Sequence, residues 1–153
     1  MEIIKQYNLG FAPKDPSIII NTLKKEFSIA IFKDINSIKS DLGKLRLVWS
    51  NSWNWALDND LKFKFLLQLD NTSCSERVKN HPEIIEKYEL FNNFIQEQVD
   101  KKLMRNVDTY FLIGSMFGLI ISMVNHLTQF PQKIKDQVFI EQSWEMFYSY
   151  LKP

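Results

Sequence analysis

"TYFLIGSMFGLIISMVNHLTQFPQ", residues Thr109–Gln132, contains no Asp, Glu, Lys or Arg in 24 consecutive positions. An α-helix of this length is ~36 Å long at ~1.5 Å per residue, which is enough to cross a bilayer. Its most apolar part, Tyr110–Val124, is only 15 residues long, and the polar residues Asn125 and His126 follow directly. Because a membrane span needs about 20 predominantly apolar residues, the stretch favours a buried helix, and we expect no membrane association.

A helix this apolar has to be covered by protein on nearly every side. A small domain covers one side, so the other side predicts a partner chain, and we expect a homodimer. Spacings of four, three, four and three place small or mildly polar groups on one face, where a second helix can approach closely: Phe111, Ser115, Gly118, Ser122 and Asn125. A heavier face suits the core of the domain itself: Ile113, Phe117, Ile120 and Val124.

The composition indicates a single globular domain. Of 153 residues, 45% are hydrophobic and 24% charged, which is an ordinary globular mixture. Four glycines and five prolines leave little room for a turn-rich β fold. Nineteen basic and 18 acidic residues leave a net charge of +1, so the chain as a whole has no electrostatic footprint for nucleic acid. The single cysteine, Cys74, excludes an internal disulfide and suits a reducing cytoplasm.

The other segments complete an all-α, single-domain bundle of about six helices. Asp15 followed by Pro16 is typical of a helix start, and apolar residues recur at spacings of three and four up to Ile38. Leu61–Leu69 alternates like a strand in its first half, but no second strand is there to pair with it, so we interpret it as a short helix. The remaining predicted helices are Ser40–Asn59, Glu83–Leu103 and Ile134–Leu151, with a polar loop at Asp70–Pro82.

No arrangement of residues predicts catalysis or metal binding. The sequence lacks Glu-x-x-His, His-Glu-x-x-His, paired cysteines and a glycine-rich phosphate loop. His81 and Cys74 belong to the polar loop, where a solvated imidazole and an incidental free thiol are the simplest interpretations. His126 ends the apolar helix, where the helix dipole favours a histidine; an anchor for a ligand or a contact across a dimer is the alternative. We therefore expect no enzyme, no metal and no cofactor.

Three of the four tryptophans fall within "WSNSWNW", Trp49–Trp55. A buried indole N–H needs an acceptor, so a plain core would be filled more simply by Leu and Phe. The cluster predicts a cavity with aromatic and methionine walls that accepts an apolar or aromatic small molecule. Ordinary core packing is the alternative. The predicted lining is Trp49, Trp53, Phe65, Tyr88, Phe91, Met116 and Met123.

Taken in order, these segments resemble the regulatory part of TetR-type transcriptional repressors over about Phe11–Leu151. "FAPKDPSIIINTLKKEF" (Phe11–Phe27) is similar to the junction where the recognition helix of such repressors leads into the first regulatory helix. "LGKLRLVWSNSWNWALDNDLKFKFLLQLDN" (Leu42–Asn71) resembles the next pair of helices. The segment from Pro82 to Leu127 is similar to the long amphipathic helix, basic turn and apolar penultimate helix of the family.

The resemblance implies a dimeric, ligand-sensing domain without chemistry of its own, with residues 1–14 as a remnant N-terminal segment and residues 15–153 as the regulatory domain. In the family, the middle helices enclose an inducer pocket, and the last two helices of each subunit form the dimer interface. The implied interface residues are Phe111, Ser115, Gly118, Ser122, Asn125, Phe139, Met146 and Tyr150.

The family's helix-turn-helix head would precede Phe11, where only ten residues stand in this sequence. We therefore expect a cytoplasmic protein in which this chain alone binds no specific DNA. A free-standing helical binding or interaction protein with the same pattern of helices is the alternative to a regulatory domain.

Overall fold

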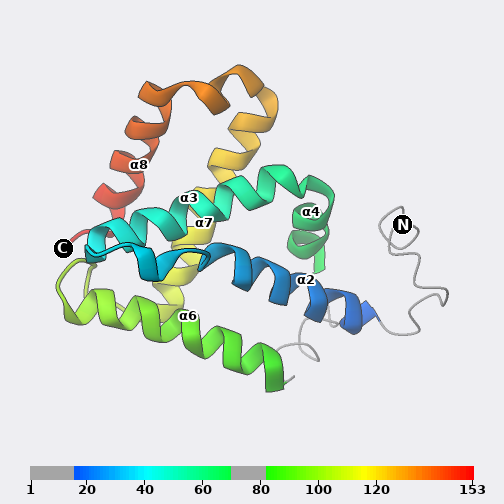
Figure 1. Ribbon diagram of the computed structural model, residues 1–153, viewed down its shortest axis with the longest axis horizontal. Coiled ribbons are helices and arrows are strands. Elements are labelled where there is room, and N and C mark those ends of the chain that lie inside the picture. Colours follow the sequence, from blue (N-terminus) through cyan, green and yellow to red (C-terminus); the bar gives the residue numbers. More distant parts are fainter. Residues whose placement is uncertain (1–15, 70–81) are drawn as a thin grey trace.

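The computed structural model describes residues 16–69 and 82–153, which form six α-helices, two short 3-10 helices and no strand (Figure 1). The α-helices are α2 (Pro16–Ile31), α3 (Asp41–Asp58), α4 (Asp60–Leu69), α6 (Pro82–Asp100), α7 (Thr109–Gln129) and α8 (Gln137–Leu151). The 3-10 helices are η1 (Ile35–Ser37) and η2 (Pro131–Lys135). The prediction of an all-α bundle is confirmed, and so is the short helix at α4. The expectations for residues 1–14, Asp15, Cys74 and His81 fall outside the described residues.

The central helix is α3, which packs against α2, α4 and α7 (Figure 1). Ser40 caps its N-terminus, because the Ser40 Oγ accepts a hydrogen bond from the Gly43 amide at 3.1 Å. At the other end, the Asn59 side chain donates to the Trp55 carbonyl at 3.0 Å. The buried residues of α3 are Leu45, Val48, Trp49, Ser52, Trp53 and Ala56. These positions recur at spacings of three and four, so the fully buried residues of α3 share one face of the helix.

The first described helix, α2, ends earlier than its apolar spacing predicts. The apolar repeat continues over residues 20–38, but the helix stops at Ile31. Asp34 follows with φ of 62°, a left-handed backbone conformation that an α-helix does not contain. The Asn51 side chain of α3 donates hydrogen bonds to the carbonyls of Ile31 and Lys33, at 3.2 and 3.1 Å. Asn51 thereby satisfies acceptors that the end of the helix leaves without an internal partner.

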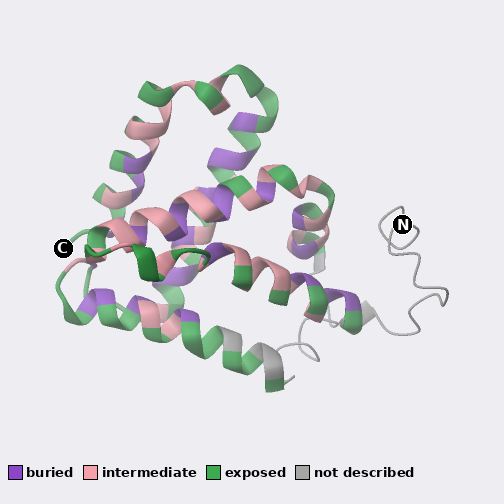
Figure 2. Cartoon of the chain, viewed as in Figure 1, coloured by how far each residue is buried: buried purple, intermediate pink, exposed green. Residues whose placement is uncertain are grey.

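The apolar stretch forms α7, a 21-residue helix that packs against α3 and α6 on one side. Asp108 caps it by accepting a hydrogen bond from the Phe111 amide at 3.0 Å, and Pro131 lies just beyond its end. Its buried residues are Leu112, Ile113, Met116, Ile120, Met123, Val124 and Leu127. By length and composition α7 could cross a membrane, but core helices pass the same test, and 39% of its most apolar window is buried in this chain. Figure 2 shows buried and exposed turns alternating along it.

The last helix, α8, begins at Gln137, three residues later than the predicted start at Ile134. The residues before it form η2, and the side chain of Asp136 caps α8 by accepting from the Phe139 amide at 3.1 Å. Lys133 donates a hydrogen bond to the Asp136 carboxylate at 2.6 Å and thereby lowers the pKa of that group. The cap, rather than the apolar spacing, sets the start of the helix.

Aromatic contacts and one ion pair attach α8 to α3. The Trp144 ring lies 5.4 Å from the Trp49 ring, and the Arg46 guanidinium lies 5.7 Å from the Trp144 ring. Arg46 also forms an ion pair with Glu141, which lowers the pKa of Glu141. The contribution of this pair is therefore present at neutral pH and is lost as the pH falls through that lowered pKa. Both side chains of the ion pair are partly exposed, so the contacts between the buried aromatic rings provide most of the attachment.

Replacement by alanine should change the free energy of unfolding in opposite directions at two glycines on different helices. A Cβ at Gly43 would lie 2.6 Å from the Ser40 Oγ and 2.8 Å from the Ile38 Cγ2, so it would displace the cap of α3. We expect Gly43→Ala to lower the free energy of unfolding by about 1 kcal/mol, the usual value of an N-cap. A Cβ at Gly114 in α7 meets no atom within 4 Å. Gly114→Ala should raise that free energy by about 0.5–1 kcal/mol.

Urea denaturation followed by circular dichroism measures both changes. If Gly43→Ala were as stable as Gly114→Ala, the Ser40 cap would contribute nothing to the start of α3.

Candidate functional site

A cavity of about 360 Å³ lies where α2, α4, α6 and α7 meet. In Figure 1, α2 and α6 run side by side, and α4 stands at one end of α2. The cavity is mostly apolar. Its lining comprises Lys24, Phe27, Ser28 and Ile31 of α2; Phe63, Leu66 and Leu67 of α4; Tyr88 and Phe91 of α6; and Tyr110, Ile113, Gly114, Phe117 and Ile121 of α7. The volume lies at the lower end of the range of small-molecule pockets, about 300–1,000 Å³.

Three phenylalanines from three helices form one continuous wall of this cavity. The Phe117 ring of α7 lies 5.7 Å from the Phe27 ring of α2 and 6.0 Å from the Phe91 ring of α6. Beyond this wall, Phe27 also contacts Trp55 of α3, at 5.0 Å between ring centres. Such pairs contribute about 0.5–1.5 kcal/mol each beyond the area they bury. The wall is therefore held by contacts outside the cavity and does not depend on a ligand for its shape.

The polar groups of the cavity belong to Lys24, Ser28, Tyr88 and Tyr110. The Lys24 Nζ donates a hydrogen bond to the Tyr88 hydroxyl at 3.5 Å and lies 5.4 Å from the centre of the Tyr88 ring. Lys24 and Ser28 are four residues apart, so they lie on the same face of α2. No carboxylate is among the described residues that line the cavity.

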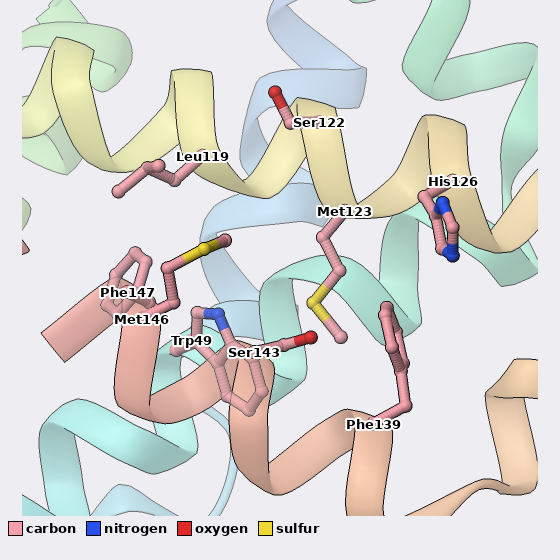
Figure 3. Close-up of a pocket in the computed structure, with 9 residues that line it drawn as sticks. All are labelled: Trp49, Leu119, Ser122, Met123, His126, Phe139, Ser143, Met146 and Phe147. Atoms are coloured by element: carbon pink, nitrogen blue, oxygen red, sulfur yellow. The ribbon is translucent and has the colours of Figure 1, made fainter.

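A second cavity, of about 230 Å³, lies between α7 and α8 above Trp49 of α3. Figure 3 shows Met123 extending from α7 toward α8, with Phe139 and Met146 of α8 opposite. The His126 ring stacks on Phe139, with ring centres 5.1 Å apart, and contacts Phe130 at 4.8 Å. The remaining lining residues are Leu119, Ser122, Ser143 and Phe147. The imidazole thus lies between two phenylalanine rings at the end of α7.

The structure divides the seven predicted ligand residues among three places. Trp49 and Met123 line the second cavity, and Tyr88 and Phe91 line the first. The other three line neither cavity: Trp53 and Met116 are buried in the main core, and Phe65 packs against a small cluster between α2 and α4. The prediction of one common cavity is therefore wrong in its geometry, and the ligand role of each residue stays a prediction.

The division has a physical reason in the partners that the aromatic residues meet. Trp49 contacts the rings of Trp144 and Phe147 of α8 in tilted arrangements, whereas Phe91 contacts Phe117 of α7. The two cavities therefore lie along different halves of α7. The Trp53 Nε1 is buried without a hydrogen-bond partner among the described residues, so the expected acceptor for this indole is not supplied by the fold.

Twelve residues that line the first cavity were not predicted from the sequence, of which five lie on α7, three on α4 and four on α2. Phe27 and Ile31 belong to the apolar stripe of α2 and have the spacing of core residues. Lys24 precedes Phe27 by three positions, so it extends the same face, and this charge at the edge of an apolar stripe is the signal in the sequence that marks the cavity.

The predicted dimer face is open on the single chain. On α7, the side chain of Phe111 is 62% exposed, and Gly118, Ser122 and Asn125 are also exposed, while Ser115 is half-buried. On α8, Met146 is 67% exposed, Tyr150 is exposed and Phe139 is half-buried against His126. The heavier face of α7 is turned inward as predicted: Ile113, Ile120 and Val124 are buried and Phe117 is half-buried. The role of the open face as an interface stays a prediction.

Within residues 16–69 and 82–153, no group of three or more His, Cys, Asp or Glu side chains is placed to hold a metal ion. The groups that line the two cavities are aromatic, aliphatic, thioether and hydroxyl side chains, with the Lys24 ammonium at the first cavity and the His126 imidazole at the second.

No protein-family model matches the sequence, and no curated protein sequence matches it. Among solved structures, the chain is similar to a protein from Shewanella sp. PV-4 that is provisionally assigned to the TetR family of transcription regulators. The TM-score is 0.78, and the match covers 90% of this chain and 73% of that chain at 14% sequence identity. Identity this low shows the fold alone, so this chain has the fold of a TetR-like regulator.

Filling the first cavity should be tolerated by the fold. Gly114 lines this cavity, and a side chain there meets open space. We expect Gly114→Met to keep or raise the free energy of unfolding, because Met is a better helix former than Gly. The same variant should lose most of its affinity for an apolar fluorescent dye, since the methionine occupies the space between the walls.

The matched control is Asn54→Met, which introduces the same side chain at an exposed position of α3, outside the lining of either cavity and away from the open face. Fluorescence titration with the dye compares the two variants. Equal dye affinity in both would show that the cavity is not the place where apolar molecules bind.

Proposed function

We propose that this chain is the ligand-sensing and dimerisation part of a TetR-type transcription regulator. The observation that carries the proposal is the fold shared with the Shewanella protein over 90% of this chain. In this proposal an apolar or aromatic small molecule binds between α2, α4, α6 and α7, and two copies associate through α7 and α8. The protein has no enzymatic activity or cofactor and acts in the cytoplasm.

The first cavity supports the ligand-sensing role because α2 forms one of its walls. Phe27 of α2 contacts Phe117 of α7 in the phenylalanine wall, and Ile31 of α2 also lines the cavity. A ligand that contacts both sides stabilises one arrangement of α2 relative to α6 and α7. The ligand can shift the equilibrium between two arrangements of α2 only by the difference in its binding free energy for each of them. In this proposal the DNA-reading head of the regulator precedes α2, so this wall is where ligand binding would reach the head.

The open face of α7 and α8 supports the dimer. Phe111, Met146 and Tyr150 expose large apolar surfaces that an isolated chain would leave in water. Gly118 and Ser122 lie on the same face of α7 as Phe111 and are small enough for a facing helix to approach closely. A two-fold interface of this kind should bury ~1,200 Å² or more, with an apolar centre.

Specific duplex DNA binding is not a property that we assign to this chain by itself. Phosphate contacts supply much of the affinity of DNA-binding proteins, and the net charge here is +1. In this proposal, operator recognition belongs to the head of a TetR-type regulator, and this chain supplies the ligand response and the pairing of two heads.

A charge placed at the centre of the open face should separate the subunits. Gly118 is exposed on α7, and a Cβ there meets no atom of its own chain, so Gly118→Arg should fold as a monomer does. In a dimer, the guanidinium would be buried against the second copy without a carboxylate partner, which costs several kcal/mol. Light scattering after size exclusion should show the wild type as a dimer and Gly118→Arg as a monomer.

Asn54→Arg is the matched control, since it adds the same charge at an exposed position of α3, away from the open face, and should remain dimeric. A wild-type chain that is folded, monomeric and able to bind apolar ligands would contradict the dimer and favour the free-standing helical binding protein.

A further inference from the structure

The first cavity changes in character along α2. At one end lies Lys24, a half-buried residue with a cationic head, and at the other lies Ile31, which is buried. The two are seven residues apart, so they are separated by about 10 Å along the helix axis. Phe27 and Ser28 lie between them. A molecule lying along α2 in this cavity would therefore meet an ammonium at one end and only apolar groups at the other.

The charged and polar groups at the cationic end act together. The Lys24 ammonium donates to the Tyr88 hydroxyl at 3.5 Å, and an ammonium has three N–H donors. The Tyr88 oxygen accepts this bond, so the Tyr88 O–H stays available to donate to a second acceptor. Both groups can therefore donate to one ligand oxygen pair, whatever else Lys24 contacts.

The charge of the lining favours one class of ligand head group. Lys24 is the cation among the described residues that line the cavity, and no carboxylate lines it. A ligand carboxylate would form charge-assisted hydrogen bonds, which are about twice as strong as those between neutral groups. A cationic ligand would be repelled by the ammonium, and a second acidic group would have no cation to pair with at the apolar end.

The apolar end of the cavity determines the chemical character and size of the remainder of the ligand. The rings of Phe27, Phe91 and Phe117 form the wall, and their faces suit an aromatic ring or an alkyl chain. With a volume of about 360 Å³, the cavity accepts a small molecule rather than a long lipid.

We propose that the ligand of this cavity is a small amphipathic monoacid, whose carboxylate is bound by Lys24 and Tyr88 and whose aromatic or alkyl part lies against the phenylalanine wall. This inference rests on the proposed role of the cavity as the ligand site, and it goes further by assigning the ligand's charge and orientation.

Phenyl-substituted acids test the assignment together with matched neutral and cationic compounds. The probes are the series from phenylacetate to 6-phenylhexanoate, with 4-phenylbutan-1-ol and 4-phenylbutan-1-amine as isosteres of 4-phenylbutyrate. In isothermal titration calorimetry at neutral pH, we expect the best acid to bind about tenfold more tightly than the alcohol, the usual gain from a charge-assisted hydrogen bond. The amine should bind most weakly.

A substitution at Lys24 tests whether its charge is responsible for the preference for the acid over the alcohol. Lys24→Met keeps the length of the side chain and removes the ammonium, so the acid should lose its advantage while the alcohol binds as before. Lys25→Met is the control, because Lys25 is exposed on the same helix and does not line the cavity. Thermal unfolding by circular dichroism checks that both variants fold.

Gly114→Met separates failure of this inference from failure of the ligand site itself, because it should abolish binding of every probe. If the alcohol binds the wild type as tightly as the acid, or if Lys24→Met leaves the preference for acid unchanged, the acid assignment is overturned and the ligand site stands. If no probe binds at millimolar concentration, or if Gly114→Met binds normally, both the assignment and the ligand site are overturned.

Discussion

The structure depends on α7, a helix without Asp, Glu, Lys or Arg, whose inner side packs against α3, α6 and α8. Met116, Ile120 and Leu127 hold its inner side in the main core with Trp49 and Trp53 of α3. Burial of such side chains contributes about 1.5–3 kcal/mol each, so this contact makes a large contribution to the stability of the bundle. The outer side carries Phe111 and small residues that the chain leaves exposed. The helices of the same chain cover the inner side of α7, and a second chain is needed to cover its outer side.

The same helix borders both cavities, which links the two proposed roles of the chain. Its N-terminal half lines the cavity with α2 and α6 through Ile113 and Phe117, and its C-terminal half lines the cavity with α8 through Met123 and His126. Because packed helices move as rigid elements, a ligand that repositions α7 against α2 would also reposition α7 within the dimer. In this account ligand binding and dimer geometry are thermodynamically linked, so each would change the affinity of the other.

The helical period and the capping residues predict most of the helices of this fold. They do not predict which helix each apolar face packs against. The division of α7 into a heavy inner face and a light outer face follows from spacing alone. The end of α2 at Ile31 and the start of α8 after Asp136 do not, because apolar repeats continue past the points where backbone and caps end a helix. The single predicted cavity fails for a related reason: a stripe such as Trp49 and Trp53 shows which face is apolar, but not which helix it meets.

The central claim is that a second copy of the chain buries the outer face of α7 and α8. The solvent exposure of Met146 tests this claim directly. The chain has five methionines; Met116 is 1% exposed and Met146 is 67% exposed in the single chain. NMR of methyl-labelled methionine, with Met146→Leu for assignment, can measure how strongly a soluble paramagnetic agent broadens each methyl signal. The account predicts that the Met146 signal is protected nearly as well as that of Met116, because a second copy covers it. A Met146 signal that broadens at low concentrations of the agent, while that of Met116 persists, would contradict it.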